Sequence, residues 1–179
     1  MNIQSKIKNY EVIFSDNFEN HIKQHSNDDL FYIIDYNVYK IYKKKLNSLN
    51  LKRVYLLEAI EENKTLDKAQ EIIKFFLDNN IKRGNKIVAL GGGITQDLAC
   101  FISSILFRGI EWIFYPTTLL AQCDSCIGSK SSINIKDYKN QLGTFYPPER
   151  IIIDMQFLES LSREDMLSGI GEIIKVHFL

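Results

Sequence analysis

The sequence predicts an α/β fold, in which a largely parallel sheet carries helices on both faces. Short apolar runs of strand character alternate with helical patterns along the 179 residues, and this alternation is typical of crossover units that join parallel strands. Hydrophobic residues make up 45% and charged residues 25% of the chain, which is an ordinary globular composition. A chain of this length can bury a core without a disulfide or a structural metal.

The predicted strands are short apolar runs, and the predicted helices show apolar residues at helical spacing. Between residues 66 and 77, for example, Leu66, Ala69, Ile72 and Phe76 fall on one helix face. We expect strands at 10–15, 30–35, 53–57, 86–90, 111–115 and 151–154, and helices at 66–77 and 96–107. All three prolines and seven of the nine glycines lie between residues 84 and 148. Loops therefore dominate the middle of the chain, and loops commonly carry function.

A last helix is predicted after Ser162, because Asp165 follows it three residues later in a pattern close to a capping box. This helix has no stop signal, since residues 173–179 are largely apolar, whereas natural chain ends usually fray into polar sequence. We therefore expect an α/β domain at 1–160 and, at 161–179, the start of a helical C-terminal domain that is mostly missing. Gly169 and Gly171 each weaken the helix by about 1 kcal/mol relative to alanine, so we expect close packing or a ligand beside them.

Charge and cysteine usage exclude several classes of protein. Lys and Arg number 22 and Asp and Glu number 22, so no field of one sign favours nucleic acid or an anionic membrane. There is no apolar signal segment and no apolar run of about 18 residues, and we expect a cytoplasmic protein. Cys123 and Cys126 have zinc or redox spacing but lack a second pair of ligands. We expect them to be small residues beside a functional loop.

A triple glycine separates a predicted strand from a predicted helix. Gly91, Gly92 and Gly93 follow the apolar run at 86–90, and such a turn lets backbone N–H groups approach a phosphate at a helix N-terminus. The pattern is not G-x-G-x-x-G, so a nucleotide site and a merely tight turn both remain open at this point. Asp97, in the first turns of the helix, either stabilises the helix dipole or contacts a cofactor hydroxyl.

From Gly91 onward, several motifs occur in an order that resembles the 3-dehydroquinate synthase family and the wider sugar-phosphate cyclases. They are Gly91-Gly-Gly-x-x-x-Asp97, Phe107-Arg-Gly109, Pro116-Thr-Thr-Leu-Leu-Ala-Gln-Cys-Asp124-Ser, Ile127-Gly-Ser-Lys130, Lys139-Asn140-x-Leu-Gly143, Phe145-Tyr-Pro147 and Gly171-Glu172-Ile-Ile-Lys175. Asp35-x-Asn37-Val and Glu61-x-x-Lys64-Thr-Leu match more loosely. The resemblance implies a Rossmann-like NAD-binding domain at 1–160, followed by the first helix of a helical metal-binding domain.

The resemblance also implies a reaction and its partners. The family closes an open-chain sugar phosphate into a carbocycle with loss of phosphate, and 3-dehydroquinate synthases act on 3-deoxy-arabino-heptulosonate 7-phosphate in the shikimate pathway. That activity is a carbon–oxygen lyase reaction that recycles NAD and needs a divalent metal, zinc or cobalt. The implied partners are a small phosphorylated sugar acid and a second copy of the chain in a homodimer, with no nucleic acid and no membrane.

Matching the motifs residue by residue implies the site. Cofactor contacts are expected from Asp35, Asn37, Glu61, Lys64, Gly92, Gly93, Asp97, Thr117, Thr118, Asp124 and Lys139. Substrate contacts and catalysis are expected from Lys130, Asn140, Lys175 and Arg108, with Arg108 meeting the substrate phosphate across a dimer interface. Arginine suits forked recognition of phosphate and lysine suits a point contact. Glu172 is the expected metal ligand.

Other interpretations stay open. Glu172 alone cannot hold zinc, which needs three protein ligands in a catalytic site, and none of the three histidines matches the positions that the family uses. His21 and His25 fit a solvated helix face, and His177 fits a packing or outer-shell residue. Gln96 and Ser129 stand where the family usually has glycine, and Ala59-Ile60 stands where it has Pro-Gly.

These departures leave the substrate open among 3-deoxy-arabino-heptulosonate 7-phosphate and the substrates of cyclases of the 2-deoxy-scyllo-inosose or epi-valiolone type. A related metal-dependent polyol or glycerol phosphate dehydrogenase is the next alternative. A truncated, NAD-binding remnant without catalytic activity is the third. Lys130, Lys139 and Glu172 also have explanations without function. Exposed lysines are common on any protein surface, and Glu172 with Lys175 fits an ordinary ion pair on a helix.

Overall fold

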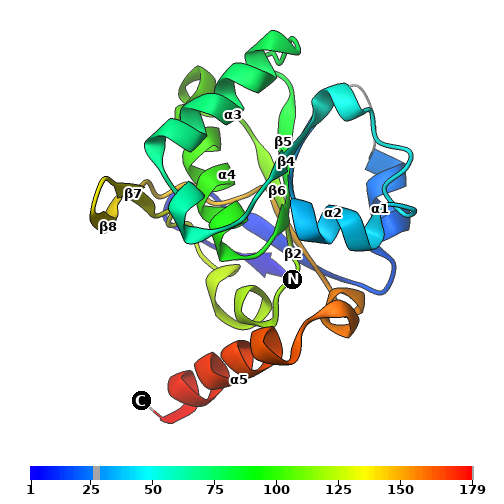
Figure 1. Cartoon of the computed structure of the whole chain (residues 1–179), viewed down its shortest axis with the longest axis vertical. Coiled ribbons are helices and arrows are strands. Elements are labelled where there is room, and N and C mark those ends of the chain that lie inside the picture. Colours follow the sequence, from blue (N-terminus) through cyan, green and yellow to red (C-terminus); the bar gives the residue numbers. More distant parts are fainter. Residues whose placement is uncertain (26–28, 179) are drawn as a thin grey trace.

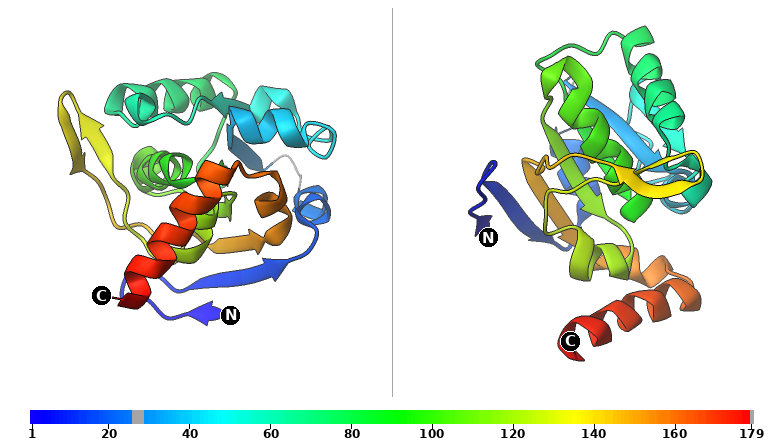
Figure 2. Two further views of the ribbon diagram at one scale, coloured as in Figure 1. Left: turned by 60° about the horizontal axis from the view of Figure 1, so that its bottom comes forward. Right: turned by 90° about the vertical axis from the view of Figure 1, so that its left-hand side faces the viewer.

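One twisted sheet forms the centre of the molecule, and its order confirms the predicted α/β fold (Figure 1). The computed structural model describes residues 1–25 and 29–178. Within them, seven strands pair in the order β1-β2-β9-β6-β5-β3-β4. All neighbours in this sheet are parallel except β1, which pairs antiparallel with β2 at one edge. A second, two-stranded sheet is the hairpin β7–β8, which projects from the body in Figure 2.

The strands are β1 (Asn2–Ile3), β2 (Tyr10–Ser15), β3 (Leu30–Asp35), β4 (Val54–Leu57), β5 (Lys86–Gly91), β6 (Trp112–Pro116), β7 (Ile133–Ile135), β8 (Tyr138–Leu142) and β9 (Arg150–Asp154). The α-helices are α1 (Phe18–His25), α2 (Tyr36–Tyr42), α3 (Leu66–Asp78), α4 (Gly93–Ile105) and α5 (Arg163–Phe178). Short helical turns are η1 (Leu51–Arg53), η2 (Glu61–Asn63), η3 (Leu106–Arg108), the π-helical η4 (Ala121–Ser125) and η5 (Met155–Ser160).

Helices cover both faces of the sheet because the buried strands carry apolar residues on both sides. On β3, Phe31 and Ile33 join the core under α3 and α4, while Tyr32 and Ile34 join the core under α1 and α2. Figure 1 shows the two helix layers on opposite sides of the strands. The predicted strands and the helix at 66–77 are confirmed to within one or two residues.

Several elements lay outside the sequence prediction. Helix α4 begins at Gly93, earlier than the expected residue 96, because Gly92 adopts the extended conformation of an N-cap. It ends at Ile105, and Phe107 and Arg108 then take positive φ angles of 53° and 65°. Helix α2, strand β1 and the hairpin β7–β8 were not predicted. Helix α1 carries a half-buried His21, whereas the side chain of His25 lies outside the described part of the chain.

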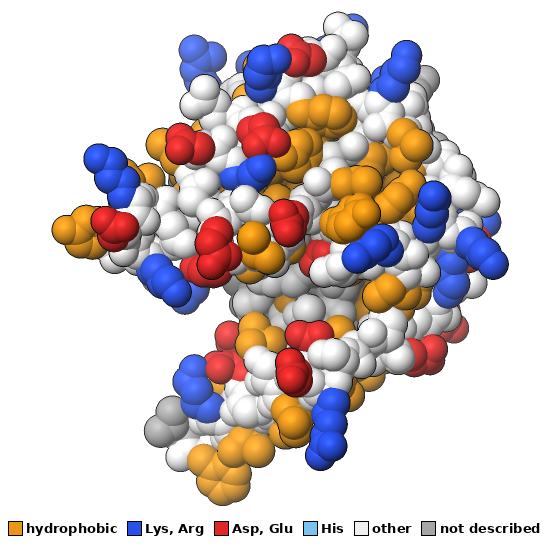
Figure 3. All heavy atoms as spheres, in the orientation of Figure 1, with side chains coloured by type: hydrophobic (Ala, Val, Ile, Leu, Met, Phe, Trp, Pro, Cys, Tyr) orange, Lys and Arg blue, Asp and Glu red, His pale blue; other side chains and the backbone are white. Residues whose placement is uncertain are grey.

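Helix α5 starts where the sequence predicts it. The backbone N–H of Asp165 donates to the Ser162 hydroxyl over 3.1 Å, and that hydroxyl donates to the Asp165 carboxylate over 2.7 Å. The helix extends away from the body in Figure 2, and Leu167 and Phe178 on it are 55% and 83% exposed. Figure 3 shows apolar side chains along this outlying helix. Among the helices of the described residues, none is both long and apolar enough to cross a bilayer.

The two glycines of α5 differ in their surroundings. A Cβ added to Gly169 would lie 2.6 Å from the side chain of Leu119 and 2.8 Å from the backbone nitrogen of Leu120, whereas a Cβ on Gly171 would meet nothing within 4 Å. Gly169 is therefore the point where α5 packs closely on the chain entering η4. The predicted close packing is confirmed for Gly169, while packing does not explain Gly171.

This difference makes a matched pair of variants. Gly169→Ala should loosen α5 from η4, because the clash involves backbone and cannot be relieved by a rotamer change. Gly171→Ala should stabilise the helix by about 1 kcal/mol through helix propensity alone. Amide hydrogen exchange across residues 163–178 measures both. Equal protection in the two variants would contradict the close-packing role of Gly169.

Candidate functional site

The direction in which successive strands are added to the sheet reverses between β3 and β5. The chain leaves β3 through α2 on one face and leaves β5 through α4 on the other, while β4 and β6 lie on opposite sides of this strand pair. Such a switch point opens a crevice outside the carboxyl ends of the strands, where ligands of open α/β sheets bind. Asp35 is the last residue of β3 and Gly91 is the last residue of β5. The predicted site residues Asp35 and Gly92 therefore lie at this crevice.

A smaller cavity of about 320 Å³ lies in the crevice. Predicted cofactor residues that line it are Asp35, Asn37, Gly92, Gly93, Thr117 and Thr118. Asp35 caps helix α2 by accepting the Asn37 backbone N–H over 2.8 Å. Burial raises the pKa of the Asp35 carboxyl, and the backbone hydrogen bonds from Asn37 and Val38 oppose that shift.

The lining of this cavity combines the start of helix α4 with a buried threonine hydroxyl. Gly92 caps α4 without a side-chain hydrogen bond, so no cap side chain satisfies the first N–H groups of the helix. A Cβ on Gly93 would meet nothing within 4 Å, which leaves open space beside the helix start. The Thr117 hydroxyl is buried and has no hydrogen-bond partner in the described residues. These features fit a phosphorylated ligand such as the pyrophosphate of NAD.

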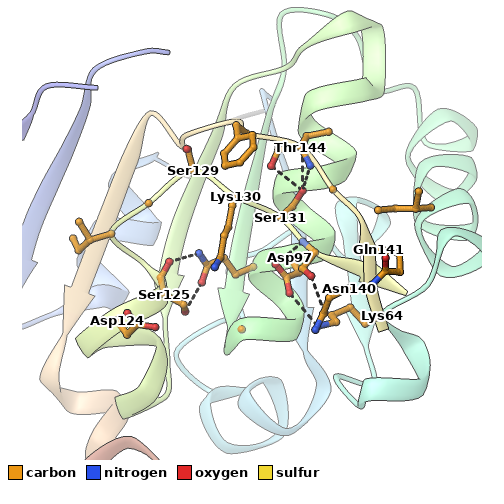
Figure 4. Close-up of a pocket in the computed structure, with 18 residues that line it drawn as sticks. Lys64, Asp97, Asp124, Ser125, Ser129, Lys130, Ser131, Asn140, Gln141 and Thr144 are labelled. Carbon is orange, nitrogen blue, oxygen red and sulfur yellow. Dashed lines mark hydrogen bonds and ion pairs between the residues drawn. The ribbon is translucent and has the colours of Figure 1, made fainter. Parts of the chain in front are cut away.

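Figure 4 shows a larger cavity of about 870 Å³. Gly93 lines both this cavity and the smaller one, so the two adjoin there. Predicted site residues on its walls are Lys64, Gly93, Asp97, Asp124, Lys130 and Asn140. They come from the segment before α3, from α4, from η4 and from the hairpin with the loop before it. The structure thus brings most of the predicted residues together in two neighbouring cavities rather than in one, with Asp35 and Asn37 in the smaller cavity and Lys64 in the larger.

A nearly buried lysine organises the larger cavity. Lys64 is 8% exposed, and its ammonium lies 3.3 Å from the Asp97 carboxylate and 3.6 Å from the Glu61 carboxylate. It also donates to the Asn140 side-chain oxygen over 2.8 Å, as Figure 4 shows. A lysine is rarely buried unless paired, and here two carboxylates and an amide oxygen surround the charge.

Burial dominates the ionisation of Asp97. It raises the pKa of this carboxyl from 3.8 to about 6, although Lys64 and the Ser132 backbone N–H, which donates over 2.9 Å, both favour the charged form. The pKa of Glu61 moves the other way, chiefly because the Asn134 amide donates to its carboxylate over 2.9 Å. Two carboxylates beside one ammonium therefore differ in proton affinity, with Asp97 taking up a proton first as the pH falls.

Two residues, Gln96 on the wall of the larger cavity and Asn134 behind it, were not predicted to act in the site. Asn134, buried in β7, contacts Glu61, Lys64 and Asn140 at once, and an Asn between two isoleucines in a short strand was the available signal. Gln96, at a position where the family resemblance suggested glycine, is 6% exposed. It donates to the Ser125 carbonyl over 2.5 Å and accepts from the Ser125 hydroxyl over 2.8 Å, which ties α4 to η4.

Glu61, behind Lys64, and the remaining predicted residues line neither cavity. Arg108 is exposed at the end of η3, just after α4. Lys139 is exposed on β8, and its charge helps to lower the pKa of Glu61. Glu172 and Lys175 form a 2.7 Å ion pair on α5. The three cysteines are free, with Cys126 buried and Cys123 exposed beside the Gly169 carbonyl.

The described residues do not make a metal site by themselves. No group of three or more His, Cys, Asp or Glu side chains among residues 1–25 and 29–178 could hold a metal ion. The Glu172 carboxylate pairs with Lys175 instead, and His177 is exposed with its Nδ1 2.9 Å from the Ile173 carbonyl. Glu172 would need partners from outside this set of residues to bind zinc or cobalt.

Asp97 should make the stability of the chain depend on pH. Its pKa is raised on folding, from 3.8 to about 6, so the folded state holds a proton that the unfolded state has lost, and the free energy of unfolding falls as the pH rises through this interval. Asp97→Asn mimics the protonated form. Its free energy of unfolding should equal that of the wild type below pH 3.8 and exceed it by about 1–3 kcal/mol at neutral pH. Urea unfolding at several pH values measures this difference. A difference independent of pH would contradict the raised pKa.

Comparison with known proteins places this geometry in a family. Residues 54–168 match the model of the 3-dehydroquinate synthase N-terminal family. The chain is 46% identical over 154 residues to the 3-dehydroquinate synthase of Clostridium tetani (strain Massachusetts / E88), covering 84% of this chain and 41% of the relative. It is 36% identical over 183 residues to that of Thermoanaerobacter sp. (strain X514), covering 97% of this chain and 51% of the relative.

A solved structure of 2-deoxy-scyllo-inosose synthase, complexed with carbaglucose-6-phosphate, NAD+ and Co2+, is similar with a TM-score of 0.83 and 25% identity. The similarity covers 98% of this chain and 50% of that one. The chain thus spans about half the length of the relatives it matches. Since the matching region contains both the glycine turn and the residues around Lys64, the chain belongs to the 3-dehydroquinate synthase N-terminal family.

Proposed function

We propose that this chain is the NAD-binding part of a cyclase that converts 3-deoxy-arabino-heptulosonate 7-phosphate into 3-dehydroquinate with loss of phosphate. One observation carries the proposal: two cavities adjoin at Gly93, at the switch point of the sheet. The smaller has the uncapped helix start and the unpartnered Thr117 hydroxyl, and the larger has Lys64, Lys130 and Asn140. A dinucleotide and a second anionic ligand could then bind side by side.

The residue types suit these two ligands. In the smaller cavity, the helix start and the Thr117 hydroxyl would bind the pyrophosphate of NAD, while Asp35 and Asn37 would contact the adenosine side. Asp97, Glu61 and Lys64 would hold the ribose hydroxyls by accepting and donating hydrogen bonds. NAD supplies the hydride acceptor when it is bound. What the chain supplies is orientation and fixed charge.

In the larger cavity, Lys130 and Asn140 would bind the carboxylate and hydroxyls of the sugar acid, and Asp124 lies on the same wall. The chain carries no net charge, so recognition of a doubly anionic substrate depends on where single cations lie. Arg108 and Lys175 lie outside this cavity, and we assign them to the substrate phosphate and carboxylate from a partner copy or after closure of α5. Glu172 would be one of several ligands to a divalent metal in the whole protein.

The boundary between an α/β domain at 1–160 and a helical unit from 161, the homodimer and the cytoplasmic location stay predictions of the sequence. The 2-deoxy-scyllo-inosose synthase resemblance supports a second candidate substrate, glucose 6-phosphate, on the same scaffold. In either case the cavity that holds the sugar would be the one lined by Lys130 and Asn140.

Binding of NAD to the chain tests the cofactor part. Gly93→Val should weaken it by about tenfold or more, because the added side chain enters the space where the two cavities meet. Gly84→Val is the matched control, since a Cβ at either glycine meets nothing within 4 Å and Gly84 lines neither cavity. Isothermal titration with NAD measures both. Equal affinity in the two variants would refute the assigned pyrophosphate site.

The reaction itself can be tested on a chimera that joins the C-terminal part of the Clostridium tetani enzyme to this chain. With NAD and zinc or cobalt, it should release phosphate from 3-deoxy-arabino-heptulosonate 7-phosphate without accumulating NADH. Lys130→Ala should lower the rate by about a hundredfold through loss of a charged substrate contact. Phosphate release from glucose 6-phosphate alone would reassign the substrate, and net NADH formation from an alcohol would indicate a dehydrogenase instead.

A further inference from the structure

The amide of Asn134 joins three segments of the chain at one buried point. Its backbone N–H donates to the Lys64 carbonyl over 2.8 Å. Its side-chain Nδ2 donates to the Glu61 carboxylate over 2.9 Å, and its Oδ1 accepts the Asn140 backbone N–H over 2.8 Å. The residue is 7% exposed, so these bonds face little competition from water.

The conformation of Asn140 depends on that contact. Asn140 has a φ of 58°, a left-handed conformation that asparagine tolerates better than most residues. With its backbone held by Asn134, its side-chain oxygen accepts from the Lys64 ammonium over 2.8 Å and from the Ser132 hydroxyl over 2.7 Å. Asn134 holds the backbones of both Lys64 and Asn140, and these two backbones determine where the Lys64 ammonium lies in the cavity.

The hairpin has few other ties at this point. Strands β7 and β8 form a sheet of their own, and β8 is exposed along most of its length. Isolated β-bridges pair Thr65 with Asn134 and Lys130 with Phe145. Ile133 is buried in the core beside α4. Burial of Ile133 fixes where the hairpin docks, and the Asn134 side chain hydrogen-bonds both Glu61 and Asn140, the same two residues that the Lys64 ammonium contacts.

We propose that Asn134 is a positioning residue, which sets the relative placement of Glu61, Lys64 and Asn140 and so couples the cofactor side of the larger cavity to its substrate side. The inference rests on the proposed function, since it assumes that these three residues meet NAD and the sugar acid. Asn134 and Glu61 line neither cavity, and Asn134 acts on the larger cavity through Lys64 and Asn140, which lie on its wall.

Asn134→Asp tests this directly because it keeps the shape and the acceptor for Asn140 while replacing the donor to Glu61. The groups that face this point are Glu61 on η2, Lys64, Asp97 on α4 and Lys139 on β8. At about pH 8 two carboxylates would confront each other where the hydrogen bond now lies, and near pH 5 they would share a proton. NAD affinity relative to the wild type should fall about tenfold or more at the higher pH and recover at the lower.

Two variants control for charge and for simple loss of packing. Lys136→Asn makes the same net charge change at the exposed hairpin turn, where φ is 51°, and should leave affinity unchanged at both pH values. Asn134→Leu removes both side-chain hydrogen bonds and should show a loss that lower pH does not recover. If Asn134→Asp binds NAD like the wild type throughout, or its loss ignores pH, the proposal is overturned.

A readout without ligand separates this inference from the proposed function. Amide hydrogen exchange at Asn140, followed by NMR on the unliganded 179-residue chain, should be about tenfold faster or more in Asn134→Asp at high pH. Exchange should return towards the wild-type rate in the double variant Glu61→Gln with Asn134→Asp, which restores an amide opposite a carboxylate. A wild type that fails to bind NAD would refute the proposed function alone, whereas unchanged Asn140 exchange in the folded single variant would refute the role of Asn134.

Discussion

The turn that ends β5 is the constraint on which the rest of the site depends. The chain passes from the buried strand β5 into helix α4, and the turn between them has no room for side chains at Gly91 and Gly92. A Cβ on Gly91 would lie 2.3 Å from the Thr95 hydroxyl, and one on Gly92 would lie 3.1 Å from the Thr118 side chain. Because glycine occupies these positions, α4 can start directly at the carboxyl end of β5, with its first N–H groups directed at the crevice. Both cavities meet there, at Gly93.

The buried ammonium of Lys64 determines how charges are arranged in the larger cavity. Lys64 is only 8% exposed, and Asp97, Glu61 and Asn140 surround its ammonium. A buried ion pair contributes little net stability, since desolvation offsets the attraction, and the raised pKa of Asp97 shows that its charge is held at a cost. Such strain is typical of sites that are selected for binding rather than for stability.

Helix α5 is joined to the domain by a different kind of contact. Gly169 allows close backbone packing on the segment that enters η4, and this segment also carries Asp124, on the wall of the larger cavity. Any movement of α5 would therefore reach the cavity through η4, which Gln96 also ties to the start of α4. The apolar residues Leu167 and Phe178 of α5 are exposed and lie on either side of Gly169 along the helix.

Local patterns made much of the fold predictable. Strands β2 and β3 match the predicted ranges, and β5 and β9 match within a residue, because each is an apolar run bounded by polar or turn residues. Helix α2 was missed because it follows β3 without a loop and starts from the Asp35 cap, a short signal inside a sequence rich in tyrosine and lysine. The hairpin was missed because β8 is polar and exposed and so lacks alternation.

The sequence by itself determined the parallel sheet, the glycine turn and the order of the family motifs, since periodicity and residue spacing are local properties of the chain. Only the tertiary structure decided that most of the predicted residues divide between two cavities, that burial raises the pKa of Asp97 to about 6, and that Asn134 joins Glu61 to Asn140. The reason is physical. Hydrogen bonds and desolvation depend on which groups the fold brings within a few ångströms, and these groups lie far apart along the chain.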